Sequence, residues 1–217
     1  MKTLESFLPE ILPDVPGCPS DMAIRALRNT IIEFCEKSLI HQDTLDAITV
    51  YENVTDYDLE PPKNYRIQKI MKVWYLGQEL EPLAPDDIGL PDAYRTSITG
   101  YTASKGPPAG FTQKDVDTFT ILPIPDQKYA SSLTMRVALV PLRTVTEVAD
   151  FLFEIWGETL GFGTKARLML TPGKPYSNNE AANFNQVRYT TGLNDARQRA
   201  SRGNVRSSLR VKLMRNP

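Results

Sequence analysis

The chain has 217 residues, of which 41% are hydrophobic and 24% are charged. This composition excludes a wholly disordered protein and suits a folded one with a sizeable core. No apolar run approaches the roughly 18 residues that a membrane-spanning helix needs, and the first residues include no apolar signal segment. We therefore expect synthesis in a cytoplasm without export.

The formal net charge of −1 conceals two regions of opposite sign. Seven of the 25 basic residues lie between Arg197 and Pro217, and no acidic residue follows Asp195. The chain before Arg197 therefore holds 18 basic and 26 acidic residues, a net charge of −8. An acidic body with a basic C-terminal tail is the main electrostatic feature of the sequence.

Residues 1–19 are rich in proline and are expected to form an N-terminal arm that packs on the body. A helical segment follows at 20–45, in which Ser20 or Asp21 can cap a helix that runs to about Lys37. Apolar residues at helical spacing define its buried face: Ala23, Leu27, Ile31, Phe34 and Cys35.

The segment 46–140 changes to a period of two, which is typical of strands. Tyr65–Leu76 is the strongest strand, and Ser132–Val140 alternates apolar and polar residues as a half-buried strand does. In the first of these we expect Ile67, Met71, Val73 and Tyr75 on one face and Ile70, Trp74 and Leu76 on the other. Shorter strands are expected from Ala47, at Thr55–Leu59, Glu79–Leu83, Tyr94–Tyr101 and Val116–Ile124.

A long loop, rich in proline and glycine, is expected at 84–115. Long loops in compact domains are often functional, so this one is either a contact loop or a solvated insertion.

The segment 141–203 is expected to form two helices joined by a turn at Pro172–Pro175. The first helix, Thr144–Leu170, has one apolar row for the core and a second row beside it: Phe151, Ile155 and Phe162. A helix that is apolar on two sides must be covered on two sides, so the second row is expected to meet a neighbouring subunit. Three glycines within this helix, Gly157, Gly161 and Gly163, indicate close helix approach or a kink. Ser177–Glu180 matches the capping-box pattern at the start of the second helix.

Together these elements predict an α+β fold. The N-terminal helix and the C-terminal helix pair would form a helical bundle, packed with an antiparallel sheet or sandwich from the middle of the chain. We expect a single domain over residues 1–217 that ends in an extended basic tail at 204–217.

The sequence holds no recognisable catalytic set. His41 is the only histidine and lies just past the first helix, where a surface or helix-end position is expected rather than a general base. No P-loop or dinucleotide-binding fingerprint occurs. We therefore expect a protein that is not an enzyme and uses no cofactor.

Metal binding is not expected either. Cys18 and Cys35 are too few for a zinc site; Cys35 is expected in the core, and a bond between the two stays open. The paired acids Asp56 with Asp58, and Asp86 with Asp87, are expected to be solvated loop residues.

The basic tail interleaves charged and apolar residues. Leu209, Val211 and Leu213 alternate with basic residues as they would in a strand, which a merely solubilising tail would not need. We prefer docking on a partner, for which strand addition is one route. Contact with nucleic-acid phosphates and a solvated tail remain alternatives.

Several different short motifs follow one another along most of the chain. They are Leu8–Pro19, Ile24–Cys35, Tyr57–Leu59, Arg136–Pro141, Phe151–Phe153, Lys174–Ser177 and the second helix as far as Gly203. This ordered set resembles the head–tail adaptor proteins of tailed bacteriophages, the family of the podophage tail tubular protein A and related adaptors below the portal.

The resemblance implies a structural virion protein of the neck or tail, without enzymatic activity. It implies a ring, usually of twelve copies, between the portal protein and the next tail component, such as a nozzle, tail tube or terminator. DNA would pass through its lumen without sequence-specific binding, which an acidic body suits. The C-terminal elements would reach the portal, so the expected docking residues are Arg202, Arg206, Leu209, Arg210, Val211, Lys212 and Leu213. A nucleic-acid-binding module and a tail-completion protein at another position in the virion are the alternatives.

Overall fold

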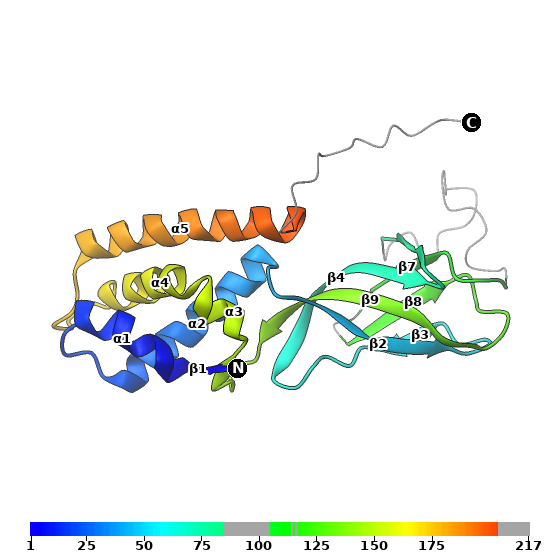
Figure 1. Ribbon diagram of the computed structural model, residues 1–217, viewed down its shortest axis with the longest axis horizontal. Coiled ribbons are helices and arrows are strands. Elements are labelled where there is room, and N and C mark those ends of the chain that lie inside the picture. The colour runs from blue at the N-terminus through cyan, green and yellow to red at the C-terminus, as the bar shows by residue number, and fades with distance from the viewer. Residues whose placement is uncertain (85–104, 114, 116, 204–217) are drawn as a thin grey trace, which may run out of the picture. The chain divides into compact units, whose positions relative to one another are not determined.

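The computed structural model describes residues 1–84, 105–113, 115 and 117–203 (Figure 1). Helices and antiparallel sheets are both present, so the predicted α+β class is confirmed. A single domain was expected, but the chain groups into two compact units. Unit 1 comprises Met1–Ile40 and Thr146–Pro217, and unit 2 comprises His41–Val145.

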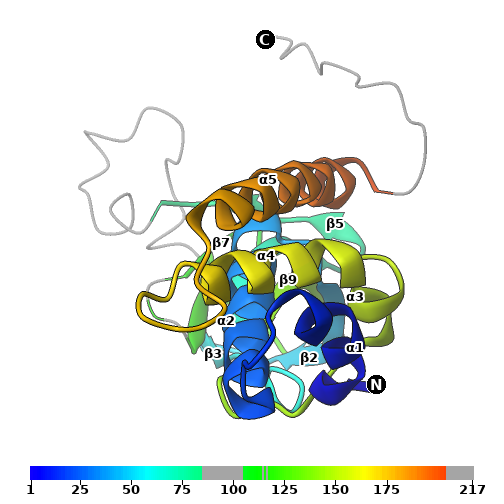
Figure 2. The same cartoon turned by 90° about the vertical axis from the view of Figure 1, so that its left-hand side faces the viewer.

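Unit 1 is helical. Its helices are α1 (Leu8–Ile11), α2 (Ser20–Ser38), α3 (Asp150–Glu154), α4 (Gly157–Met169) and α5 (Asn179–Arg202). Short 3₁₀ turns at Leu4–Phe7 and Leu12–Asp14 flank α1, and strand β1 (Lys2–Thr3) pairs with β10 (Glu147–Val148). The expected N-terminal arm is therefore folded into the unit, with Leu4, Phe7 and Ile11 buried. Figure 2 shows α4 between α5 and α1.

Helix α2 is the N-terminal helix that the sequence predicts. All five residues of its expected apolar face are buried. The helix is shorter than the segment 20–45, because Leu39 adopts a left-handed conformation with φ 55° and ends it. Neither Ser20 nor Asp21 caps it: the N-cap is Pro19, and no side chain makes a capping hydrogen bond.

The predicted helix Thr144–Leu170 is wrong as a continuous element. Val148 is buried in strand β10, opposite Lys2, and helical structure starts only at Asp150. A second interruption follows α3, where Trp156 has φ −115° and ψ 4°. The Trp156 side chain is buried and its ring lies 5.4 Å from that of Phe34. The apolar spacing therefore marks buried positions correctly but not the backbone that carries them.

Close helix approach is confirmed at one of the three glycines. A methyl group on Gly163 would lie 2.6 Å from Tyr189 of α5 and 2.7 Å from Thr30 of α2. The same group on Gly157 or Gly161 would meet only a carboxyl oxygen of Glu10, at 3.8 or 3.9 Å. Of these three glycines, only Gly163 lies where the neighbouring helices leave no room for a side chain.

Helix α5 begins one residue later than the capping-box pattern indicates. Its N-cap is Asn178, whose Oδ1 accepts a hydrogen bond from the backbone N–H of Ala181 at 3.1 Å. Ser177 lies outside the helix and its N–H donates to the carbonyl of Lys174. Asparagine and serine are equally good caps, so residue type alone could not place the start.

Unit 2 is built from strands. They are β2 (Gln42–Val50), β3 (Asp56–Asp58), β4 (Tyr65–Tyr75), β5 (Gln78–Glu79), β6 (Glu81–Pro82), β7 (Gly110–Thr112), β8 (Thr118–Leu122) and β9 (Tyr129–Pro141). Two four-stranded sheets result, with strand orders β2-β9-β4-β5 and β3-β8-β7-β6. One core cluster draws on both sheets, including Phe119 and Ile121 from one and Leu133 and Met135 from the other. The sheets therefore pack face to face as a sandwich.

Strand β4 differs from its predicted faces. Its pairing with β9 shifts between Ile67 and Lys69 and again between Ile70 and Lys72. Each bulge adds one residue and moves the following side chains to the other face. As a result Ile70 is buried, whereas Met71, expected beside Ile67, is only partly buried.

The loop expected at 84–115 is partly strand. Gly110–Thr112 forms β7 inside the second sheet and is buried. The strand expected at Tyr94–Tyr101 lies outside the described residues.

Candidate functional site

The described residues hold no arrangement that points to catalysis. Among them, no group of three or more His, Cys, Asp or Glu side chains could hold a metal ion. Asp56 and Asp58 are exposed on β3, and Asp56 accepts a hydrogen bond from the Thr120 hydroxyl. Asp86 and Asp87 lie outside the described part of the chain.

His41 lies just past the end of α2, as expected, but it is partly buried rather than on the surface. Its ring packs edge-on against Tyr65, with ring centroids 4.8 Å apart. Burial lowers the pKa of His41, although the nearby Asp43 opposes the shift. The packing of unit 2 therefore favours the neutral form of the imidazole.

Both cysteines are free thiols, so the bond left open between Cys18 and Cys35 is not formed. Cys35 is fully buried, as expected, and burial raises the pKa of its thiol to about 12. Such a thiol packs as a small apolar side chain and does not act as a nucleophile.

The residues predicted for a subunit contact do not share one helix. Phe151 lies in α3, Ile155 directly follows it, and Phe162 lies in α4. Ile155 is 56% exposed, whereas Phe151 and Phe162 are partly buried and Lys165 covers the Phe162 ring at 4.9 Å. We call the surface formed by Phe151 and Ile155 the α3 surface.

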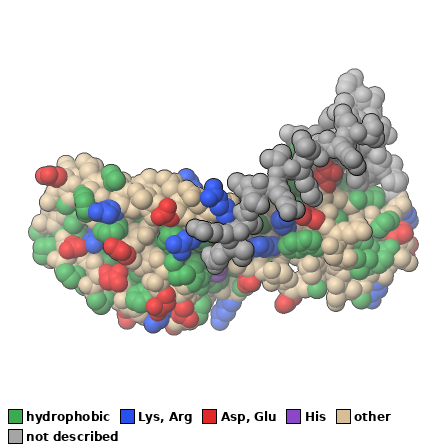
Figure 3. Space-filling model, turned by 45° about the horizontal axis from the view of Figure 1, so that its top comes forward, with side chains coloured by type: hydrophobic (Ala, Val, Ile, Leu, Met, Phe, Trp, Pro, Cys, Tyr) green, Lys and Arg blue, Asp and Glu red, His purple; other side chains and the backbone are tan. Residues whose placement is uncertain are grey.

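A second exposed apolar surface was missed in the sequence. Phe184 and Val187 of α5 are 58% and 66% exposed and lie one helical turn apart. Arg188 stacks over the Phe184 ring at 5.4 Å. Figure 3 turns the top of Figure 1, where α5 lies, toward the viewer and shows hydrophobic side chains set among charged and polar ones. In the sequence, residues 184 and 187 are spaced as on one face of a helix. This face differs from the one that carries the buried Asn185, Tyr189 and Leu193.

The basic residues near the end of the chain differ in their contacts. Arg197 donates from Nε to the carbonyl of Lys37, and Arg199 stacks over Trp156 at 5.1 Å. These two side chains therefore fasten α5 to its own bundle. Arg202 is exposed in the last turn of α5. The other predicted docking residues, Arg206, Leu209, Arg210, Val211, Lys212 and Leu213, lie outside the described residues.

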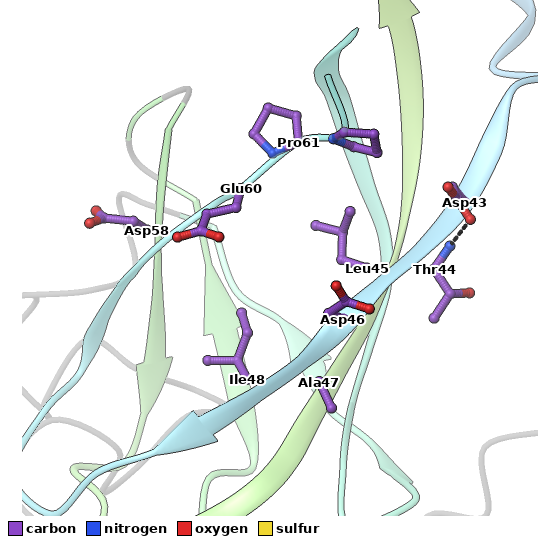
Figure 4. A pocket seen from close by; sticks show the side chains of 10 residues that line it. Asp43, Thr44, Leu45, Asp46, Ala47, Ile48, Asp58, Glu60 and Pro61 are labelled. Carbon is purple, nitrogen blue, oxygen red and sulfur yellow. Dashed lines mark hydrogen bonds between the residues drawn. The ribbon is translucent and has the colours of Figure 1, made fainter. Parts of the chain in front are cut away.

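Unit 2 contains an open groove with acidic walls (Figure 4). Strand β2 forms one wall, and the segment from Asp58 to Pro62 forms the other. Leu45 and Ile48 enter it from β2 and pack against the core cluster of the sandwich. Asp43, Asp46, Asp58 and Glu60 line it, and its described lining includes no basic residue. No local sequence pattern indicates this groove, because its two walls come from different sheets.

None of the helices that the structure describes is long and apolar enough to span a bilayer. A scan against protein-family models and a search of curated proteins both find no match to the chain. The function is therefore inferred from the surfaces of the two units and from the ordered motifs of the sequence.

Proposed function

We propose that this protein is a head–tail adaptor of a tailed bacteriophage. In this role it is a structural virion protein of the neck or tail that forms a ring between the portal and the next tail component. DNA passes through the lumen without sequence-specific binding. The ordered sequence motifs carry the choice of family, and the surfaces of unit 1 support assembly into a ring.

The supporting observation is that unit 1 exposes apolar side chains both at α3 and on α5. The α3 surface includes Ile155, and the α5 surface consists of Phe184 and Val187. Two different surfaces on one subunit are what a head-to-tail contact needs, because the first surface of one copy meets the second surface of the next. Contacts of this kind close into rings when the rotation between copies allows it.

The basic segment after α5 supplies a docking element for a partner ring. It begins near Arg202, which is exposed at the C-terminal end of the helix. A cation there interacts favourably with the partial negative charge of the helix end. In this proposal Arg202 and the alternating residues 206–213 contact the portal.

The basic segment also favours a second candidate, a nucleic-acid-binding module. Such a module would lose affinity steeply with salt, because each neutralised phosphate releases counterions. Arg197 and Arg199 are engaged within unit 1, which reduces the charge available for phosphates. Tight duplex binding that disappears on deletion of residues 204–217 would favour this candidate over the adaptor.

Electron microscopy of the purified protein with and without the portal of the same virus tests the adaptor function. We expect rings on the portal, and a stable protein without affinity for the portal would overturn the proposal. The variants Ile155→Glu and Val187→Glu each remove one surface, and Gln186→Glu on the same helix is the matched control.

A mixture of the two variants tests the head-to-tail arrangement. Neither Ile155→Glu nor Val187→Glu should form continuous rings alone. In the mixture, the intact α3 surface of the Val187→Glu variant can meet the intact α5 surface of the Ile155→Glu variant. Cross-linking on the portal should therefore recover pairs but no closed ring. If the mixture gives no more pairs than either variant alone, the two surfaces are not partners.

A further inference from the structure

The groove of unit 2 lies along the outer strands of its two described sheets. Within the described residues, β2 pairs only with β9 and β3 pairs only with β8, so each is the last strand of its sheet. Both border the groove, which has a volume of about 640 Å³. An exposed edge offers backbone N–H and C=O groups to an added strand, and natural proteins usually cover or protect such an edge.

The groove also has an apolar floor. Leu45 and Ile48 of β2 are partly buried, and Figure 4 shows them between β2 and the segment that carries Glu60 and Pro61. The pairing of β2 with β9 shifts on either side of Ile48. An extended peptide in the groove could place alternate apolar side chains on this floor, because successive side chains of a strand point to opposite faces.

The walls of the groove select a basic occupant. Asp43, Asp46, Asp58 and Glu60 are all exposed and belong to its lining. The Asp43 carboxylate accepts the backbone N–H of Thr44 at 2.8 Å. Four carboxylates around one groove repel an acidic peptide and attract a basic one.

The chain itself contains a segment with these properties. Residues 204–217 carry four basic residues, Arg206, Arg210, Lys212 and Arg215, and no acidic one. Leu209, Val211 and Leu213 alternate with Arg210 and Lys212. In an extended conformation the three apolar side chains share one face and the two basic ones share the other.

We propose that the groove binds the C-terminal segment of a second copy of this chain by strand addition. Leu209, Val211 and Leu213 contact the floor, and the basic side chains contact the acidic walls. The inference rests on the proposed function, because the ring is what brings copies together. The segment predicted to dock on the portal is then held by a neighbouring copy until the portal takes it up.

Photo-cross-linking of the full chain tests this proposal. A benzophenone amino acid replaces Val211, and light and heavy isotope-labelled copies are mixed so that links between copies differ in mass from links within one. We expect links between copies that map to residues 43–62 and weaken with salt, which screens exposed charges. Links that map elsewhere, or that occur only within one copy, would overturn the proposal.

Charge reversal provides the specific control. The double variant Asp46→Lys with Asp58→Lys changes two exposed groove residues, and Glu158→Lys with Asp195→Lys makes the same change on exposed residues of unit 1. We expect the groove variant to reduce cross-link yield by about tenfold, and the control to leave it unchanged. Adding Arg210→Glu and Lys212→Glu to the second copy should restore the yield.

The outcomes separate this inference from the proposed function. Rings on the portal together with cross-linking that ignores the groove charges would leave the adaptor function standing and overturn the strand addition. Cross-linking that follows the groove charges, in a protein without affinity for the portal, would overturn the adaptor function and keep the contact between copies.

Discussion

Replacing Gly163 by alanine probes a close contact between three helices of unit 1. The new methyl group would lie 2.6 Å from the ring of Tyr189 and 2.7 Å from the methyl group of Thr30. Both neighbours are buried, at 3% and 0% exposure, so neither can move into solvent. Gly161 is two residues away in the sequence and therefore lies on a nearly opposite face of α4. The nearest atom to a methyl group there is a Glu10 oxygen at 3.9 Å.

Two opposing effects set the size of the change. Alanine is favoured over glycine within a helix by about 1 kcal/mol. An extra carbon in a packed core costs about 1–3 kcal/mol, and two overlaps on different helices place Gly163 at the upper end. We therefore expect Gly163→Ala to lower the free energy of unfolding by about 2 kcal/mol, and Gly161→Ala to raise it by about 1 kcal/mol.

Urea unfolding followed by circular dichroism at 222 nm measures both variants, because the described helices all belong to unit 1. With a slope of roughly 2 kcal/mol per molar urea, Gly163→Ala should lower the midpoint by about 1 M. If both alanine variants stabilise unit 1 to the same extent, the close approach of α2, α4 and α5 at Gly163 does not exist.

Two further predictions concern a helix cap and a histidine. Asn178→Ala should destabilise unit 1 by about 1 kcal/mol through loss of the cap, whereas Ser177→Ala should be nearly neutral; a larger effect at Ser177 in urea unfolding would contradict the cap assignment. The second prediction concerns His41, whose pKa is lowered in the folded protein, so the unfolded chain binds the proton more tightly than the folded one does. The free energy of unfolding of unit 2 is therefore greatest above about pH 6.5, the ordinary pKa of histidine, and declines as the pH falls below this value. Trp74 fluorescence reports unit 2 in chains that carry Trp156→Phe, which removes the tryptophan of unit 1. Unfolding at pH 7.5 and pH 5.5 in that background should show this decline with His41 present and a smaller one with His41→Gln; equal declines would remove His41 as the cause.

Much of the fold follows from apolar spacing. The buried face of α2 and the alternating residues of β9 were predictable because each lies on a regular backbone with one periodicity. Leu133, Met135, Val137 and Leu139 are all at most 1% exposed, in agreement with their alternation. Ala138 and Val140 on the other side of β9 are buried as well, which no period-two pattern indicates.

Irregular backbone explains the errors. The two bulges of β4 depend on its pairing with β9, a distant part of the sequence, so Ile70 and Met71 could not be assigned to faces from local pattern. Val148 is buried at helical spacing from Leu152, yet it lies in a strand because Lys2 pairs with it. In both cases tertiary pairing overrides a local preference.

The candidate surfaces were harder to predict from the sequence than the fold. Ile155 was predicted as a contact residue, and it is the most exposed of its row. Phe184 and Val187 were overlooked because two apolar residues on a polar helix give a weak signal. The acidic groove needs Asp46 and Asp58 from separate sheets, and only the folded sandwich brings them to one place.

The division into units has a consequence for biosynthesis. Unit 2 is inserted within unit 1, between Ile40 and Thr146. The sandwich consists of one uninterrupted stretch of chain and can complete its core as soon as β9 has been made. Helix α2 leaves the ribosome early, yet it waits for α4 and α5 to cover its apolar face, because domains fold as units during synthesis. Until those helices are made, the apolar face of α2 stays uncovered, so the helical unit can complete its core only after the last part of α5 has been synthesised.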